Sequence, residues 1–375
     1  MAQQRLMKDG LGLAAIQRIS AVFAQLSDEF NAAEFEHGCL DGLQALELKE
    51  RVQHIITVMH QHLGDDFEQV GALLLQVKNH WDYGDEDDAL SGFAAWPVID
   101  YVAVYGQQHV GLSLQILAQL TPLFSAEYAI RHFIVQHYDV TVAQLLLWTG
   151  HENEHVRRLA SEGSRPRLPW GIRLDIFCQD PQPLWPILDK LKNDPSLYVR
   201  RSVANSLNDI AKDNPDWVIA CCKKWQQKAT KETLWVIKHA TRSLVKDGHP
   251  QVFSLLGYTD KPEIEVSDLN LDKQHIQLGE AITFSLELHS QSEHMQNVVV
   301  DYAVYHQKAN GKTSRKVFKL KTIALAVGER LTLKKKQLFK AITTRKYYSG
   351  VHRIEILING VAQTQADFIL TLEDD

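Results

Sequence analysis

The spacing of hydrophobic residues changes once along this chain, near residue 260, and the change limits the folds open to it. Up to about residue 258, apolar residues recur at intervals of three and four, as in "VGALLLQVKNHW", which is typical of amphipathic helices. Prolines and glycines interrupt this pattern often, so the helices should be short and joined by tight loops. Beyond residue 260, segments such as "AITFSLELHS" alternate at period two, which indicates strands.

A weak internal repeat lies within the helical part. The segments "YAIRHFI", "HVRRLAS" and "YVRRSVANSLNDIA" each carry a small or β-branched residue two positions ahead of an arginine. "WVIKHATRSLVKDG" continues the series with Lys238 in the arginine position. Irregular spacing of roughly 40 residues predicts stacked helical pairs, a HEAT-like solenoid with a polar concave face.

The strand-like part should form a separate domain. Its alternating segments cover residues 281–290, 297–306, 315–325, 330–338, 351–360 and 364–372. About seven short strands with turn signals between them predict an antiparallel sandwich of immunoglobulin type. We therefore expect a mainly α protein with a HEAT-like helical domain at residues 1–258 and an immunoglobulin-like β-sandwich at residues 263–375.

Composition excludes some classes of protein and leaves others open. No apolar run is long enough to cross a bilayer, and four cysteines without a C-x-x-C pair suit a reducing cytosol. The net charge of -6 hides a gradient, because the first hundred residues are acidic. Residues 311–353 instead hold thirteen lysines and arginines against one acid. This local asymmetry is more informative about partners than the total charge.

The segment "HENEH" matches the H-E-x-x-H zinc-protease pattern. A zinc site needs both histidines on one helix face and a third ligand downstream. His151 follows "TG", a helix terminator, so it should lie in a loop or cap, while His155 should open the next helix. We therefore expect no metal, and a zinc hydrolase is the least favoured alternative.

The residues that follow are better candidates for a functional site. Arg158 and Glu162 are one helical turn apart, and Gly163 should end their helix. The next loop carries Arg165, Arg167 and Trp170. Arginines bind phosphates, an indole face suits a cation or nucleobase, and a carboxylate suits a developing positive charge. Alternatively, Glu162 only pairs with Arg158, and Trp170 only fills a repeat interface.

These residues also carry a family resemblance. "VRRLASEGSRPRLPWG" and "LYVRRSVANSLNDIAKDNP" resemble the AlkC branch of the AlkC/AlkD DNA alkylation-repair glycosylases. The resemblance extends through "MKDGLGLAAIQRIS" and "FSAEYAIRHFI", and so covers essentially the whole helical part. The sandwich is similar to the immunoglobulin-like appendage of some AlkC proteins.

The resemblance implies a monofunctional DNA glycosylase without metal or organic cofactor. It would act in base excision repair by hydrolysing the N-glycosidic bond of cationic N-alkylated bases, chiefly 3-methyladenine and also 3-methylcytosine. By motif, Glu162 matches the principal catalytic acid, Asp209 a second carboxylate and Glu127 a third. Trp170 matches the aromatic wall, and Arg158 would brace the acids. Alternatives from the residues alone are an exposed solenoid acid for Asp209 and a helix N-terminal acid for Glu127. Lys238 invites a Schiff-base lyase interpretation, but the family favours a phosphate contact.

The expected partner is double-stranded DNA containing alkylated bases, bound by a monomer in the bacterial cytosol at the nucleoid, with no membrane. The expected phosphate contacts on the solenoid are Arg131, Arg157, Arg158, Arg165, Arg167, Arg200, Arg201, Lys238 and Arg242. On the sandwich, Lys312, Lys334 and Lys336 should clamp the backbone, with protection of an edge strand as the alternative. The rival function is a non-catalytic HEAT-repeat adaptor or DNA-binding protein.

Overall fold

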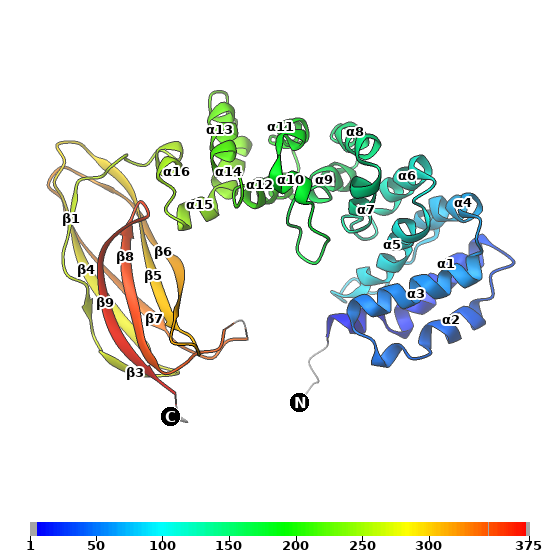
Figure 1. The fold of residues 1–375 in the computed structure, drawn as a ribbon, viewed down its shortest axis with the longest axis horizontal. Coiled ribbons are helices and arrows are strands. Elements are labelled where there is room, and N and C mark those ends of the chain that lie inside the picture. Colours follow the sequence, from blue (N-terminus) through cyan, green and yellow to red (C-terminus); the bar gives the residue numbers. More distant parts are fainter. Residues whose placement is uncertain (1–5, 344, 373–375) are drawn as a thin grey trace. The chain divides into compact units, whose positions relative to one another are not determined.

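The computed structural model describes residues 6–343 and 345–372, in which helices come first and strands last (Figure 1). The helices are α1 (Leu13–Leu26), α2 (Ala32–Leu40), α3 (Leu48–Leu63), α4 (Phe67–Val77), α5 (Ala95–Tyr105), α6 (Val110–Leu120), α7 (Ala129–Gln136), α8 (Tyr138–Trp148), α9 (Glu154–Glu162), α10 (Asp175–Gln179), α11 (Trp185–Leu191), α12 (Leu197–Ile210), α13 (Pro215–Gln226), α14 (Lys231–Ala240), α15 (Arg242–Lys246) and α16 (Pro250–Leu255). The strands are β1 (Ile264–Val266), β2 (Asn270–Leu271), β3 (His275–Gln277), β4 (Ala281–Ser290), β5 (Gln296–Gln307), β6 (Thr313–Leu325), β7 (Arg330–Leu338), β8 (Gly350–Ile358) and β9 (Val361–Thr371). The predicted mainly helical fold with a strand-rich end is confirmed. Within these ranges, no helix combines the length and the apolar character that crossing a bilayer requires.

Packing divides the chain into two compact units. The first, which we call the solenoid unit, holds the chain up to Asn214 together with Ala229–Ala240. The second, the strand unit, holds Pro215–Lys228 and the chain from Thr241 onward. Helices α13, α15 and α16 therefore belong to the strand unit, where α16 contacts both α13 and α15, although they precede the change from helix to strand between Leu255 and Ile264.

Within the solenoid unit, the helices that carry the sequence repeat pack in series. Helix α12 contacts α9 on one side and α14 on the other. Its apolar face, with Val199, Val203 and Leu207, is fully buried. An amphipathic helix of this length gains most of its stability from burying such a face, which is why these segments stack. The predicted helical-repeat architecture is confirmed.

In the strand unit, two sheets enclose an apolar core. One sheet contains β1, β4, β2 and β7, and the other has the order β3-β9-β8-β5-β6. Strand β4 alternates as predicted, so Phe284 and Leu286 point into the core while Thr283 and Ser285 do not. Antiparallel register places Lys336 opposite Thr283 and Lys334 opposite Ser285, on the outer face. The two lysines therefore share one face of β7.

The backbone of the turn between β8 and β9 packs directly against the backbone between α15 and α16. A Cβ on Gly360 would lie 2.4 Å from the Cα of Gly248, and both glycines have positive φ, 77° and 73°. Next to this contact, Asn359 Nδ2 donates to the carbonyl of Thr259 at 2.9 Å. Only glycine permits such a close approach, so a side chain at either position would push the turn off the helices.

Two buried histidines in the strand unit make its stability sensitive to acid. Arg345 Nη1 lies 2.6 Å from His306 Nε2, so the ring must accept this hydrogen bond and stay neutral. Burial, and then the charge of Arg345, lower the pKa of His306 to about 3, and burial also lowers the pKa of His352. The unfolded chain binds protons that the fold does not, so the free energy of unfolding should fall below about pH 6.5. The expected slope is about 1.4 kcal/mol per pH unit for each histidine.

Urea unfolding at several pH values between about pH 7 and about pH 4 measures this slope. Hydrogen exchange of the β5 amides reports on the strand unit in particular. His306→Phe keeps an aromatic ring in the core and should flatten the slope by one histidine's share. His294→Asn, at an exposed position, is the matched control and should leave it unchanged. A slope that is the same in wild type and His306→Phe would show that His306 titrates normally in the fold.

Candidate active site

Three carboxylates are joined by two arginines in the solenoid unit: Glu127 lies in the turn before α7, Glu162 ends α9, and Asp209 lies on α12. Arg158 Nη1 donates to Glu127 Oε2 at 2.7 Å, and its Nη2 lies 3.6 Å from Glu162 Oε1. Arg165 continues the chain, with Nη1 2.5 Å from Glu162 Oε1 and Nη2 2.8 Å from Asp209 Oδ2. The structure thus brings five of the predicted site residues into one network, which we call the acid cluster.

Helix α9 positions the centre of this cluster. Asn153 caps it by accepting a hydrogen bond from the backbone of His155, and Val156 and Leu159 bury its apolar side. Gly163 ends it, as predicted, and a Cβ there would lie 2.4 Å from Ile130 Cγ2. This close packing against α7 holds the last turn, and therefore Glu162, next to the preceding repeat.

The carboxylates are more buried than the sequence suggests. Glu162 is 4% exposed and Asp209 is 3% exposed, so the interpretation of Asp209 as an exposed solenoid acid is wrong. Buried carboxylates need charged or hydrogen-bonded partners, and Lys212 supplies Asp209 with a further contact at 3.1 Å. Burial alone would lower the pKa of Arg165, but the charges of Glu162 and Asp209 outweigh it and raise the pKa.

Arg131 holds the loop that follows α9. Its side chain is completely buried, and it donates to the carbonyls of Ile172 (2.6 Å), Gly163 (3.0 Å) and Arg165 (2.7 Å). Burial, and then the nearby charge of Arg165, lower its pKa to about 10. The expectation that Arg131 contacts phosphate is therefore wrong, because its guanidinium is committed to the protein interior.

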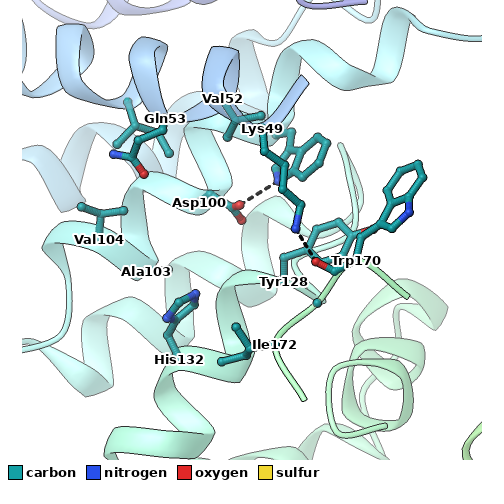
Figure 2. A pocket seen from close by; sticks show the side chains of 13 residues that line it. Lys49, Val52, Gln53, Asp100, Ala103, Val104, Tyr128, His132, Trp170 and Ile172 are labelled. Atoms are coloured by element: carbon teal, nitrogen blue, oxygen red, sulfur yellow. Dashed lines mark hydrogen bonds between the residues drawn. The ribbon is translucent and has the colours of Figure 1, made fainter. Parts of the chain in front are cut away.

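Trp170 stands at the end of the same loop in an unusual conformation. Its φ is 65°, in the left-handed region that non-glycine residues seldom adopt, and its side chain is 53% exposed. Lys49 on α3 donates to its carbonyl at 2.5 Å (Figure 2). An exposed indole on a fixed backbone can be offered to a ligand, so Trp170 does not merely fill a repeat interface.

A cavity of about 250 Å³ opens beside this loop (Figure 2). It is lined by α3, α5, the start of α7 and the loop at Trp170, through residues that include Lys49, Gln53, Trp96, Asp100, Tyr128 and Trp170. Except for Trp170, sequence reasoning missed these residues. The available signal was a tryptophan four residues before an aspartate, Trp96 and Asp100, on the otherwise apolar helix α5.

The other predicted DNA contacts differ in their surroundings. Arg167 pairs with Asp213 at 2.6 Å, while Arg201 and Lys238 are exposed and Arg242 is partly exposed. Two more residues of the expected phosphate track bond to the protein instead. Arg157 pairs with Asp194 at 2.7 Å, and Arg200 donates to the carbonyl of Asp194 at 2.6 Å. In the strand unit, Lys312, Lys334 and Lys336 are exposed.

The H-E-x-x-H segment is divided between a turn and a helix. His151 precedes α9, and its Nδ1 accepts a hydrogen bond from the backbone of Asn153, whereas His155 is in the first turn. The prediction that the two histidines flank a helix entrance is confirmed. Across residues 6–343 and 345–372, no three His, Cys, Asp or Glu side chains are grouped as a metal site.

Comparisons with known proteins agree with this arrangement. A family model described as DNA alkylation repair enzyme matches residues 124–244, which contain the whole acid cluster. A second model, the C-terminal Ig-like domain of the uncharacterised protein YhaZ, matches residues 265–372. The uncharacterized protein YhaZ of Bacillus subtilis (strain 168) is 39% identical over 329 residues, covering 88% of this chain and 89% of that protein.

A solved structure is similar over nearly the full length. It is Pseudomonas fluorescens alkylpurine DNA glycosylase AlkC, bound to DNA containing an abasic site analog. The TM-score is 0.90 with 37% sequence identity, and the match covers 98% of this chain and 100% of that chain. The likeness therefore includes both the helical and the strand-rich parts.

Proposed function

Since the chain belongs to the DNA alkylation repair enzyme family and has the fold of an AlkC-type DNA glycosylase, we propose that it hydrolyses the N-glycosidic bond of cationic N-alkylated bases in double-stranded DNA. The lesions are chiefly 3-methyladenine, and also 3-methylcytosine. One observation carries the proposal: carboxylates from three successive repeats converge in a single network. The protein acts as a monomer in the bacterial cytosol, at the nucleoid, without a cofactor.

The chemistry suits these groups. Breaking the bond between C1′ and the base returns an electron pair to the base and neutralises its charge. Positive charge then develops on the deoxyribose, where a carboxylate in a dry site stabilises it strongly. Water adds to C1′ and gives its proton to a carboxylate. We assign these tasks to Glu162 and Asp209, with Glu127 contributing charge from the preceding repeat.

The arginines of the acid cluster explain how buried carboxylates can act on DNA. Arg158 and Arg165 now neutralise the carboxylates, and their side chains are 15% and 10% exposed. The phosphates of a bound duplex compete with these carboxylates for the N–H groups of the two guanidinium groups. An exchange of carboxylate for phosphate partners would uncover the acids only when DNA is present. Trp170, held at the rim by Lys49, would then face the sugar or base.

The proposal predicts that basic residues of the strand unit bind the DNA backbone. Lys334→Gln combined with Lys336→Gln should weaken binding to duplex DNA at every sequence, because each lysine neutralises one phosphate. The slope of log affinity against log salt should fall by about 1.8 in magnitude, or about 0.9 per lost contact. A salt titration of binding to an abasic duplex, followed by fluorescence anisotropy, measures this slope.

Lys273→Gln serves as the matched control. Lys273 is a lysine of the strand unit that pairs with Glu280 at 2.7 Å, and its removal should leave the slope unchanged. If the double variant keeps the full slope, the outer face of β7 does not contact DNA. Its lysines would then protect an edge strand against aggregation.

The proposed activity is tested by incubating the full chain with methylated duplex DNA and separating the released bases by chromatography. We expect 3-methyladenine to be released, at a rate that metal chelation leaves unchanged. Binding to the duplex without any release would favour the rival function, a non-catalytic HEAT-repeat DNA-binding or adaptor protein. If chelation abolishes the release of bases, the alternative hypothesis of a zinc hydrolase is supported instead.

A further inference from the structure

The cavity beside Trp170 holds a carboxyl group with an unused oxygen. Asp100 lies on α5, and its Oδ2 accepts a hydrogen bond from Trp96 Nε1 at 2.7 Å (Figure 2). Its Oδ1 is buried and has no hydrogen-bond partner among the described residues. A buried carboxyl oxygen without a partner is costly to the fold. Such an atom, lining a cavity, is suited to a ligand that brings a donor with it.

The other walls of the cavity are suited to a flat ligand. Trp96 and Tyr128 stack with ring centroids 5.2 Å apart, and Gln53 adds an amide at the exposed rim. A nucleobase combines flat apolar faces with hydrogen-bonding edges, and amide and carboxyl side chains pair with such edges. A volume of about 250 Å³ accommodates one base.

The cavity also adjoins the acid cluster. Tyr128, in its wall, follows Glu127 in the chain. Burial raises the pKa of Tyr128 to about 12, and the charges of Glu127, Asp100 and Glu162 add to this rise. Arg158 joins Glu127 to Glu162, so the wall of the cavity at Tyr128 continues directly into the acid cluster. A base released beside Glu162 would have a binding site next to it.

We propose that this cavity holds the excised base, and that Asp100 recognises its exocyclic amino group and the adjacent ring nitrogen. This inference rests on the proposed function and adds a product subsite to it. 3-Methyladenine offers both groups, whereas in 3-methylcytosine the ring nitrogen beside the amino group carries the methyl, so only the amino group can pair with Asp100. Their amino group donates to the unpartnered Oδ1 of Asp100, while the ring lies in the cavity beside Trp96 and Tyr128.

The protonation of Asp100 fits such a ligand. Burial raises its pKa to about 7, and the hydrogen bond from Trp96 and the charge of Lys49 oppose this rise only in part. Near neutral pH the group therefore exists in both forms. As a carboxylate it accepts from the amino group, and as an acid it can also donate to the ring nitrogen.

The test titrates the full chain with free 3-methyladenine and follows the fluorescence of its tryptophans, two of which line the cavity. We expect saturable quenching, with Asp100→Ala weakening binding at least tenfold. N6,N6-dimethyladenine, which lacks the amino donors, should bind more weakly than adenine. Asp139→Ala, an exposed acid on α8, is the matched control and should bind like wild type.

If Asp100→Ala lowers the melting temperature of the protein, Gln53→Leu at the rim of the cavity serves as a second test. This variant should weaken binding of free 3-methyladenine severalfold. The absence of saturable binding in wild type would overturn the subsite, as would equal binding by wild type, Asp100→Ala and Gln53→Leu. Release of bases from methylated DNA is measured on the same preparations. Release without binding of the free base rejects the subsite alone. Binding of the free base without release rejects the proposed glycosylase and leaves the cavity as a nucleobase site that holds no product.

Discussion

Glu162→Gln should slow the release of 3-methyladenine from methylated DNA by about 100- to 1,000-fold in single-turnover assays. Glutamine keeps the size of the side chain and an acceptor for Arg165, but removes the negative charge. That charge is only 4% exposed, so solvent screens it little. Its loss removes electrostatic stabilisation from the charge that develops on the deoxyribose.

The matched control for this variant is Glu152→Gln, an exposed acid in the turn before α9, which should release the base at the wild-type rate. Asp209→Asn should also be slow, since both acids share Arg165. Melting temperatures separate loss of chemistry from loss of fold. Equal release by wild type and Glu162→Gln would place the catalytic carboxylate elsewhere.

Arg131→Met should lower the free energy of unfolding by about 3–5 kcal/mol. The variant removes a completely buried guanidinium and leaves the carbonyls of Gly163, Arg165 and Ile172 without their donor. Urea unfolding followed by far-UV circular dichroism measures the loss. The loop that carries Trp170 should also become more susceptible to proteolysis, because its hydrogen bonds to Arg131 are gone.

Two companion variants make this result specific. Arg173→Met, in the same loop but half exposed and paired at the surface with Asp175, should change stability little. Arg131→Lys should restore stability only in part, since an ammonium cannot reproduce the planar fork that reaches several carbonyls. A stability of Arg131→Met equal to that of wild type would mean that water replaces the guanidinium in the loop.

Local sequence pattern was sufficient for the longer strands and for part of the site, but it did not locate the short strands β1, β2 and β3. Period-two alternation located β4 to β9, and the pairing of Arg158 with Glu162 followed from their i, i+4 spacing. The burial of individual arginines could not be predicted from local sequence pattern. Arg131 and Arg158 occupy the same position of the repeat, yet only Arg131 lies wholly inside, because the fold of the loop after α9 decides which guanidinium it encloses.

Contacts between residues far apart in the chain could not be predicted from the sequence either. Lys49 meets the carbonyl of Trp170 across 121 positions, and no periodicity links them. The cavity at Asp100 likewise depends on four segments that only tertiary packing brings together. The division into domains at residues 258 and 263 and the catalytic roles of the acid cluster stay predictions.

The membership of α13, α15 and α16 in the strand unit has a consequence for dissection of the protein. The chain passes between the two units at Asn214/Pro215, at Lys228/Ala229 and again at Ala240/Thr241. No single protease nick or gene truncation can therefore liberate either unit intact. A graft of the immunoglobulin-like sheets onto another scaffold would have to carry α15, α16 and their glycine contact with it.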